Sequence, residues 1–206
     1  MIMKIICIGR NYSEHVKELN SAMPDDLVFF LKPETALLLN NKPFHLPQFS
    51  CDIHHEIEIV LKIKKDGKKV DEKDADNFYD ELTVGIDFTA RDIQKILKEK
   101  SLPWEKAKAF DDSAVVGKFI SKKTLPAMNN LNFHLNINNK TVQKGNTRDL
   151  LFSFDKIISH VSQYMTLKED DLIYTGTPAG VGAVKSSDVL EGFLEDQKLL
   201  LCEILQ

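Results

Sequence analysis

The stretch that most constrains the fold of this chain is residues 54–63, HHEIEIVLKI. Its apolar residues recur at every second position, which is the pattern of a half-buried β-strand. Successive side chains of a strand point to opposite faces, and each residue rises about 3.3 Å. Glu56 and Glu58 therefore lie on one side of the predicted strand, about 6.6 Å apart. The alternating apolar residues are Ile57, Ile59, Leu61 and Ile63.

These two glutamates have two interpretations. They can be the solvated face of an amphipathic strand, since periodicity alone explains most polar positions in such a strand. They can also hold a divalent cation, because hard ions such as Mg²⁺ and Ca²⁺ prefer carboxylate oxygens. Asp87, at the end of a second apolar segment at residues 82–88, is the candidate for a third ligand. The pattern alone leaves both interpretations open.

Residues 9–19, GRNYSEHVKEL, contain a candidate catalytic pair. Asn11 or Ser13 is a plausible cap for a short helix. On that helix His15 and Glu18 are spaced i, i+3 and lie on one face. A histidine held by a carboxylate can act as a general base near neutral pH. The alternative is an ordinary charged helix face in solvent.

Two further segments carry candidate ligand contacts. Lys108 stands among small residues beside Phe110, so it is either partly enclosed or a surface lysine whose stem covers apolar atoms. Residues 175–182, TGTPAGVG, can turn backbone amides toward an anion or simply connect two strands tightly. The loop matches neither phosphate-binding glycine pattern.

Composition excludes several classes of protein. The 206 residues fit one domain, 43% of them are hydrophobic, and the net charge of −4 leaves no basic footprint for nucleic acid. Three cysteines without a Cys-x-x-Cys spacing predict neither a disulfide framework nor a zinc ribbon, and favour a cytoplasmic location. The apolar run at residues 5–8 is far too short for a signal peptide or a membrane span. We therefore expect no membrane association.

The remaining pattern is mostly that of strands. Residues 64–69 carry an Asp-Gly pair that predicts a hairpin turn. Helices are expected at residues 71–79, 89–100 and 154–165, the second capped by Thr89 and apolar at Ile93, Ile96 and Leu97. Further strands are expected at residues 3–8, 27–31, 37–39, 131–139, 141–146, 172–174 and 199–205.

Five motifs occur in one order along the chain: GRNYSEH, HHEIE, GIDFTARDIQ, LPWEKAKAFD and YTGTPAGVG. Together they resemble the fumarylacetoacetate hydrolase family, in particular its short branch of acylpyruvate hydrolases and oxaloacetate decarboxylases. The resemblance covers residues 5–182, and Asp170 stands where the family usually has glycine. It implies an α+β, predominantly β fold, the mixed β-sandwich roll of the family's C-terminal domain. It also implies one catalytic domain over residues 1–206 and a homodimer.

The resemblance also implies roles for individual residues. Arg91 and Asp92 match its motif as supporting residues behind the site. The resemblance implies three ligands of Mg²⁺ or Mn²⁺, a dyad that activates water, and four contacts to a small anionic keto-acid substrate. The implied metal ligands are Glu56, Glu58 and Asp87, and the implied dyad is His15 and Glu18. The implied substrate contacts are the catalytic residue Lys108 and the binding residues Arg10, Gln94 and Thr177.

The expected activity is metal-dependent hydrolysis of a carbon–carbon bond in acylpyruvate-type 2,4-diketo acids, such as acetylpyruvate or fumarylpyruvate. In that reaction His15 activates water, and the leaving pyruvate enolate is stabilised by the metal and Lys108. Decarboxylation of oxaloacetate, or enol–keto isomerisation of the 2-hydroxyhepta-2,4-diene-1,7-dioate type, requires the same enolate stabilisation and is the alternative. A non-catalytic binding module is the third interpretation, but simple metal binding needs no general base.

Overall fold

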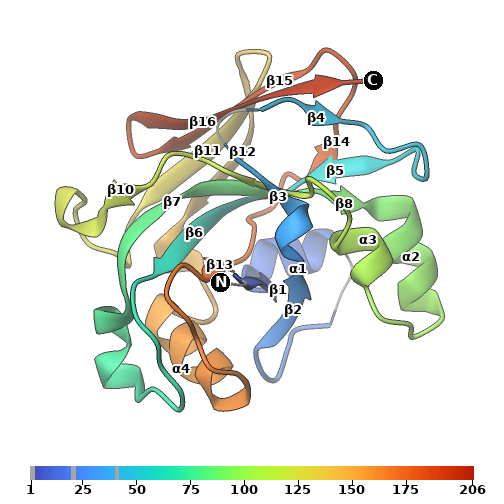
Figure 1. The fold of residues 1–206 in the computed structure, drawn as a ribbon. Coiled ribbons are helices and arrows are strands. Elements are labelled where there is room, and N and C mark those ends of the chain that lie inside the picture. Colours follow the sequence, from blue (N-terminus) through green and yellow to red (C-terminus); the bar gives the residue numbers. More distant parts are fainter. Residues whose placement is uncertain (1–2, 20–21, 40–41) are drawn as a thin grey trace.

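The computed structural model describes residues 3–19, 22–39 and 42–206, and strands dominate it (Figure 1). The largest sheet has eight strands, and β10 (Ile120–Ser121) pairs with β7 at its side. The order across this sheet is β2 (Val28–Lys32), β1 (Ile5–Gly9), β13 (Leu172–Tyr174), β6 (Ile57–Ile63), β7 (Tyr79–Asp87), β9 (Ala114–Val116) and β3 (Leu37–Leu38).

Two smaller sheets complete the β-structure. The five-stranded sheet lies above the large one in Figure 1 and runs β12 (Lys140–Asn146), β11 (Asn132–Ile137), β15 (Val189–Leu194), β16 (Gln197–Leu205) and β4 (Phe44–His45). The three-stranded sheet runs β14 (Gly182–Ala183), β5 (Ile53–His55) and β8 (Thr89–Ala90). The architecture is α+β and predominantly β, as the sequence resemblance implies.

The helices lie around these sheets. In Figure 1, α2 and α3 lie side by side next to β8, and α4 lies at the opposite end of the molecule. The α-helices are α1 (Ser13–Glu18), α2 (Arg91–Glu99), α3 (Glu105–Lys108) and α4 (Phe154–Tyr164). Short 3₁₀ helices are η1 (Glu34–Ala36), η2 (Glu72–Phe78), η3 (Lys122–Thr124) and η4 (Thr147–Asp149).

The central strand β6 is buried on both faces, so the expectation of a half-buried strand is wrong. Its alternating isoleucines and Leu61 belong to the main core, whereas Val60 belongs to a second buried cluster on the other face. The five-stranded sheet packs closely on the first face at Gly192. A Cβ atom on Gly192 would lie 2.9 Å from Val84 Cγ2 and 3.4 Å from Ile57 Cδ1. A side chain there would push the two sheets apart.

Three local predictions are wrong. Thr89 belongs to β8 and does not cap α2, which begins after Ala90 without a side-chain cap. Ile96 is 50% exposed, because only one narrow side of α2 faces the protein. Residues 64–69 do not form a hairpin turn, since the chain continues through η2 before it returns as β7. Gly67 pairs instead with Leu167.

Neither predicted cap of α1 is used, because the helix begins after Tyr12 without a side-chain cap. The Asn11 side chain instead donates to the carbonyl oxygens of Phe152 and Thr175, at 3.1 and 2.8 Å, and accepts the Phe152 N–H at 2.7 Å. Asn11 thereby joins the end of β1 to two segments more than 140 residues away.

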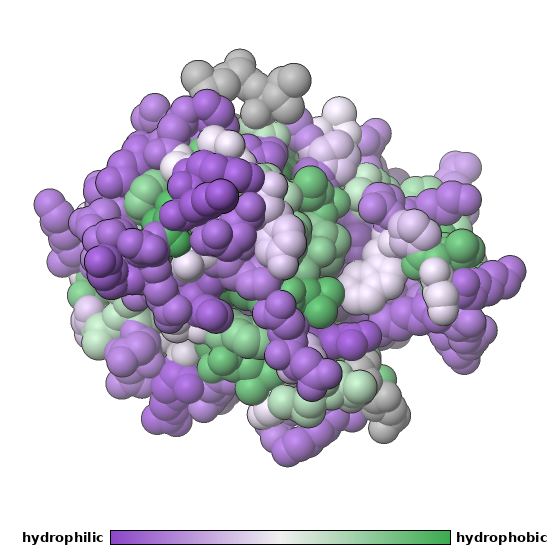
Figure 2. Space-filling model, turned by 90° about the horizontal axis from the view of Figure 1, so that it is seen from below, coloured by the Kyte–Doolittle hydropathy of each residue, from purple (hydrophilic) through white to green (hydrophobic). Residues whose placement is uncertain are grey.

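The surface is mixed in character. Figure 2 shows a face on which hydrophilic residues predominate and hydrophobic residues form smaller groups between them. Among the described residues, no helix has the length and apolar character that a membrane crossing requires. All three cysteines are free thiols, as their spacing predicts.

Candidate active site

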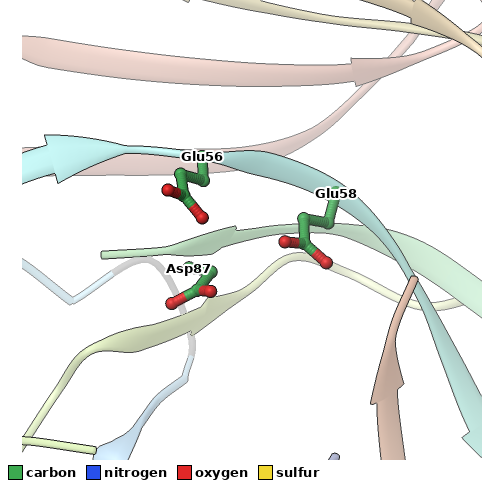
Figure 3. Close-up of side chains that lie close together, drawn as sticks. All are labelled: Glu56, Glu58 and Asp87. Atoms are coloured by element: carbon green, nitrogen blue, oxygen red, sulfur yellow. The ribbon is translucent and has the colours of Figure 1, made fainter. Parts of the chain in front are cut away.

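Three carboxylates converge at adjacent ends of β6 and β7 (Figure 3). Glu56 directly precedes β6, Glu58 lies within it, and Asp87 ends β7. The strands pair Ile57 with Ile86, and the Asp87 N–H donates to the Glu56 carbonyl at 2.9 Å. One oxygen of each carboxylate lies within 4.8 Å of the other two. Since Glu56, Glu58 and Asp87 are only 4%, 2% and 1% exposed, the solvated-face interpretation is wrong.

The two glutamates have opposite electrostatic environments. Burial raises the pKa of Glu56, but the nearby charges of Lys108 and Arg91 lower it by more than burial raises it. The pKa of Glu56 therefore lies well below its ordinary value. Burial, together with the charges of Asp87 and Glu56, raises the pKa of Glu58 well above its ordinary value. Three buried carboxylates this close repel one another, and an additional cation would relieve that repulsion.

Lys108 is the main counter-charge of this cluster. It lies at the end of α3, is 3% exposed, and places Nζ 2.7 Å from both Glu56 Oε2 and Asp87 Oδ2. Its third contact is Thr89 Oγ1 at 2.6 Å. The interpretation of Lys108 as a surface lysine is therefore wrong.

Two more cations complete the ion-pair network. Lys32 Nζ lies 2.8 Å from Asp87 Oδ1, and it also donates to Ser113 Oγ at 2.9 Å. Arg91 forms an ion pair with Glu56 through Nη2. Each of the cations Lys32, Lys108 and Arg91 is thus matched to a carboxylate of the cluster.

The carboxylate cluster fits a divalent cation. All three donors are hard oxygen atoms of the kind that Mg²⁺ and Mn²⁺ accept. Glu58 has little to balance its charge, since its Oε2 accepts one backbone hydrogen bond, from Gly176 at 2.6 Å. Glu56, Glu58 and Asp87 are therefore the residues that could hold a metal ion here.

The loop at residues 175–182 follows β13, which pairs with β6. Gly176 has φ +104, and a Cβ atom there would lie 2.7 Å from Asn11 Cβ, so only glycine fits without strain. The Gly176 N–H donates a hydrogen bond to Glu58 Oε2, and the Gly180 N–H donates one to Glu18 Oε1 at 2.9 Å. These two amides of the loop therefore orient side chains of the protein.

The predicted catalytic pair forms on α1. His15 Nδ1 lies 3.1 Å from Glu18 Oε2, and His15 is 6% exposed. The interpretation as a solvated helix face is wrong for His15, because its ring faces the protein interior. Glu18 is exposed and connects α1 to the glycine-rich loop through Gly180.

One cavity of about 40 Å³ brings most of the predicted residues together. Glu18 lies outside its wall, behind His15. Gln94 accepts a hydrogen bond from Arg91 Nη1 at 2.6 Å, and Thr177 accepts one from Gln143 at 2.9 Å. The polar residues that line the cavity are Arg10, His15, Glu56, Glu58, Asp87, Arg91, Gln94, Lys98, Lys108 and Thr177.

Comparison with known proteins agrees with this geometry. The family model described as fumarylacetoacetate (FAA) hydrolase C-terminal matches residues 4–204. The chain belongs to the fumarylacetoacetate hydrolase family. A mitochondrial oxaloacetate tautomerase from Bos taurus is 42% identical over 187 residues, which are 91% of this chain and 85% of that protein. A mitochondrial oxaloacetate decarboxylase from Dictyostelium discoideum is 41% identical over 189 residues, 91% of this chain and 87% of that protein.

A solved structure of the family also matches closely. The fumarylpyruvate hydrolase of Pseudomonas aeruginosa, in complex with Mn²⁺ and pyruvate, has a TM-score of 0.93 and 29% identity. The match covers 99% of this chain and 90% of that chain. This member of the family binds a divalent metal and a keto acid, in keeping with the buried carboxylate triad of this chain.

Sequence reasoning missed three residues that lie in or beside this cavity. Lys32 is 2% exposed. It directly follows four apolar residues of a strand, where a lysine is unusual, and this position could have indicated a buried, paired lysine. Lys98 and Trp104 both line the cavity. Lys98 lies four residues after Gln94 on α2, so helical spacing places both on one side. Trp104 gave no signal beyond its place in the LPWEKAKAFD motif.

Proposed function

We propose that this protein is a divalent-metal-dependent enzyme that interconverts the enol and keto forms of oxaloacetate. The observation that carries the proposal is one small cavity in which His15 faces the Glu56, Glu58 and Asp87 cluster together with Lys108. A base and a group of cations around one cavity are what formation of an enolate requires.

The relatives favour isomerisation over the hydrolysis that the sequence analysis gave as its main expectation. The tautomerase and the decarboxylase named above, both acting on oxaloacetate by name, are 42% and 41% identical to this chain. The fumarylpyruvate hydrolase is 29% identical. The alternative stated in the sequence analysis is therefore better supported, and hydrolysis of an acylpyruvate becomes the less supported activity.

The carboxylate cluster is proposed to hold Mg²⁺ or Mn²⁺, which when bound supplies Lewis-acid polarisation of the 2-keto oxygen. His15 is the proposed base. Since Nδ1 is hydrogen-bonded to Glu18, Nε2 is the ring nitrogen available to take the C3 proton of the keto form. The carboxylate of Glu18 stabilises the imidazolium that results.

Lys108 is proposed to stabilise the other end of the reacting group. The positive charge of its ammonium group stabilises the negative charge that develops on the enolate oxygen. Lys108 keeps its proton, because burial lowers its pKa but the charges of Asp87 and Glu56 outweigh burial and raise the pKa above its ordinary value. The enolate oxygen takes the proton that completes the enol from water; in the reverse direction that proton returns to water, and the imidazolium of His15 returns its proton to C3. Arg10, Gln94 and Thr177 are proposed to orient the substrate from the cavity wall.

Decarboxylation is the second candidate, because loss of CO₂ from oxaloacetate leaves the same enolate, and one relative carries that name. It needs no proton to be taken from C3. Removal of His15 would therefore impair tautomerisation far more than decarboxylation.

The test follows the ultraviolet absorbance of enol-oxaloacetate and the formation of pyruvate, with purified protein in Mg²⁺, in Mn²⁺ or in excess chelator. We expect metal-dependent loss of enol absorbance without stoichiometric pyruvate. Stoichiometric pyruvate would transfer the assignment to decarboxylase. Metal-dependent cleavage of acetylpyruvate or fumarylpyruvate, with no effect on oxaloacetate, would reinstate the hydrolase.

A further inference from the structure

One side of α2 is directed at the cavity. Arg91, Gln94 and Lys98 follow the i, i+3, i+7 spacing of a single helix face, and all three line the cavity. Lys95 and Lys100 are exposed on other sides of the same helix. Lys98 is thus the cavity-facing lysine of α2, although the family motif ends before it.

The charges around the cavity do not balance. Lys32, Lys108 and Arg91 each contact a carboxylate of the cluster, as described above. Arg10 and Lys98 also line the cavity, and neither has a carboxylate partner among residues 3–19, 22–39 and 42–206. Four cationic side chains and three carboxylates line the cavity, so its wall carries one more positive charge than negative charges. An anion of the right size would satisfy both cations.

The surroundings of these two cations indicate a formed site rather than two mobile surface chains. Lys98 is half-buried, with Nζ 5.7 Å from the centre of the Trp104 ring, at cation–π distance. Arg10 is also half-buried, and its Nε is a buried donor without a partner in the described part of the chain. Its backbone has φ 59, an uncommon conformation for arginine.

Both cations lack hydration that an exposed side chain would have. Burial, followed by the charges of Arg91 and Arg10, lowers the pKa of Lys98 from its ordinary value. Lys98, Arg10 and Arg91 are like charges in one cavity and repel one another, and a bound carboxylate beside them would relieve that repulsion.

We infer that Lys98 and Arg10 form a subsite for the second carboxylate of a dicarboxylic 2-keto acid. The inference rests on the proposed function and narrows it, since the C1 carboxylate and 2-keto oxygen would face the Glu56, Glu58 and Asp87 cluster. The second carboxylate would then be held by Lys98 and Arg10. Lys98 becomes the residue that selects dicarboxylic over monocarboxylic keto acids.

This subsite also bears on the choice of reaction. In decarboxylation the negative charge leaves the C4 carboxylate and moves into the enolate as the bond to CO₂ breaks. Cations at that carboxylate stabilise the ground state more than the transition state, so they slow the loss of CO₂. In tautomerisation the C4 carboxylate keeps its charge throughout the reaction. Lys98 and Arg10 then bind the substrate and the transition state equally well and do not slow the reaction. Lys98 and Arg10 therefore favour a tautomerase that leaves the carbon skeleton intact.

The experiment compares oxaloacetate with its 4-methyl ester, which has nearly the same shape but lacks the second charge. Tautomerisation kinetics, pyruvate formation and binding by titration calorimetry are measured with Mg²⁺. We expect the wild-type protein to prefer the diacid by about tenfold or more, the effect of one charged hydrogen bond. Lys98→Gln should lose most of that preference through the KM for the diacid, and values for the ester should not change. Lys98→Arg should retain the preference.

The matched control is Lys95→Gln, on the exposed side of the same helix. It should behave as the wild type with both compounds. In Lys98→Gln the ratio of pyruvate formed to enol converted should rise, which a purely structural defect would not cause. The inference is overturned if wild-type protein binds diacid and ester equally, or if Lys98→Gln weakens both alike. Preferential binding of the diacid without any acceleration of tautomerisation would refute the proposed function and leave the subsite standing.

Discussion

Lys108 Nζ lies 2.7 Å from Asp87 Oδ2, and the two groups are almost completely buried. The same ammonium lies 2.7 Å from Glu56 Oε2. Lys108 therefore shares two of the three carboxylates proposed to bind the metal. Any divalent cation that binds there competes with Lys108 for the same oxygens, so protein stability and metal affinity are coupled through this lysine.

Lys108→Met tests that coupling. In chelator the variant should be less stable by about 3–5 kcal/mol, since buried carboxylates lose their shared partner. Mg²⁺ should raise its Tm more than it raises the wild-type Tm, because the metal replaces the missing charge. Turnover should fall by about 10²–10³-fold with the loss of enolate stabilisation. Lys106→Met, exposed on the same helix, is the control. Equal Tm values and equal responses to Mg²⁺ would contradict the coupling.

Glu58→Gln should stabilise the metal-free protein. The pKa of Glu58 is raised by burial, Asp87 and Glu56, so the folded state holds this proton more tightly than the unfolded state. Folded-state stability therefore falls as pH rises from the ordinary value of 4.5 through the raised pKa. The glutamine side chain of the Glu58→Gln variant does not ionise, so the variant does not lose stability in this way as the pH rises.

In chelator at neutral pH, the Tm of Glu58→Gln should exceed that of wild type by about 2–4 °C for each kcal/mol of repulsion removed. The difference should disappear at pH values below 4.5. Stabilisation by Mg²⁺ should be lost, because one proposed ligand is gone. Thermal melts over pH, with and without Mg²⁺, measure all three effects. A metal-free variant that is less stable than wild type at neutral pH would count against this account of Glu58.

His15→Gln separates chemistry from metal binding. Loss of the general base should lower kcat/KM for tautomerisation by about 10²–10⁴-fold. The increase in Tm produced by Mg²⁺ should not change, since His15 is not a proposed ligand. Glu18→Gln should have a smaller effect, because the amide can still accept a hydrogen bond from His15. Lys17→Gln, exposed on the same helix, is the control. Wild-type turnover by His15→Gln would remove His15 from the mechanism.

Asp92 predicts a pH dependence away from the metal ligands. Its side chain accepts hydrogen bonds from Ser50 Oγ at 2.7 Å and from the Cys51 N–H at 3.1 Å, and so holds residues 50–51 against the start of α2. Burial raises the pKa of Asp92, but these hydrogen bonds outweigh burial and lower the pKa below its ordinary value of 3.8.

A lowered folded-state pKa gives stability that is present above 3.8 and is lost as pH falls through the folded value. Asp92→Ala should therefore lower the Tm at neutral pH, by the equivalent of about 1.5–3 kcal/mol if a full charged hydrogen bond is lost. The difference should shrink when the pH is well below 3.8. A Tm difference that is constant with pH would show that packing, not charge, is what Asp92 contributes.

Local spacing determined a large part of this site from the sequence alone. The pair of His15 and Glu18 follows from i, i+3 geometry, and the common side of Glu56 and Glu58 follows from strand geometry. Five motifs in order identified the family. All these features depend on neighbours within one element, or on a pattern shared with relatives.

Burial and long-range partners were decided by the tertiary structure. Sequence periodicity left the Glu56–Glu58 strand half-buried, but the second sheet covers one face and a second apolar cluster covers the other. Lys32 and Lys108 lie inside because carboxylates from β6 and β7 meet them there. The amide that serves Glu58 comes from Gly176, 118 residues away in the chain. Spacing along a chain determines which side chains share a face, whereas sheet pairing determines which faces meet, and charge balance in a cavity exists only once they have met.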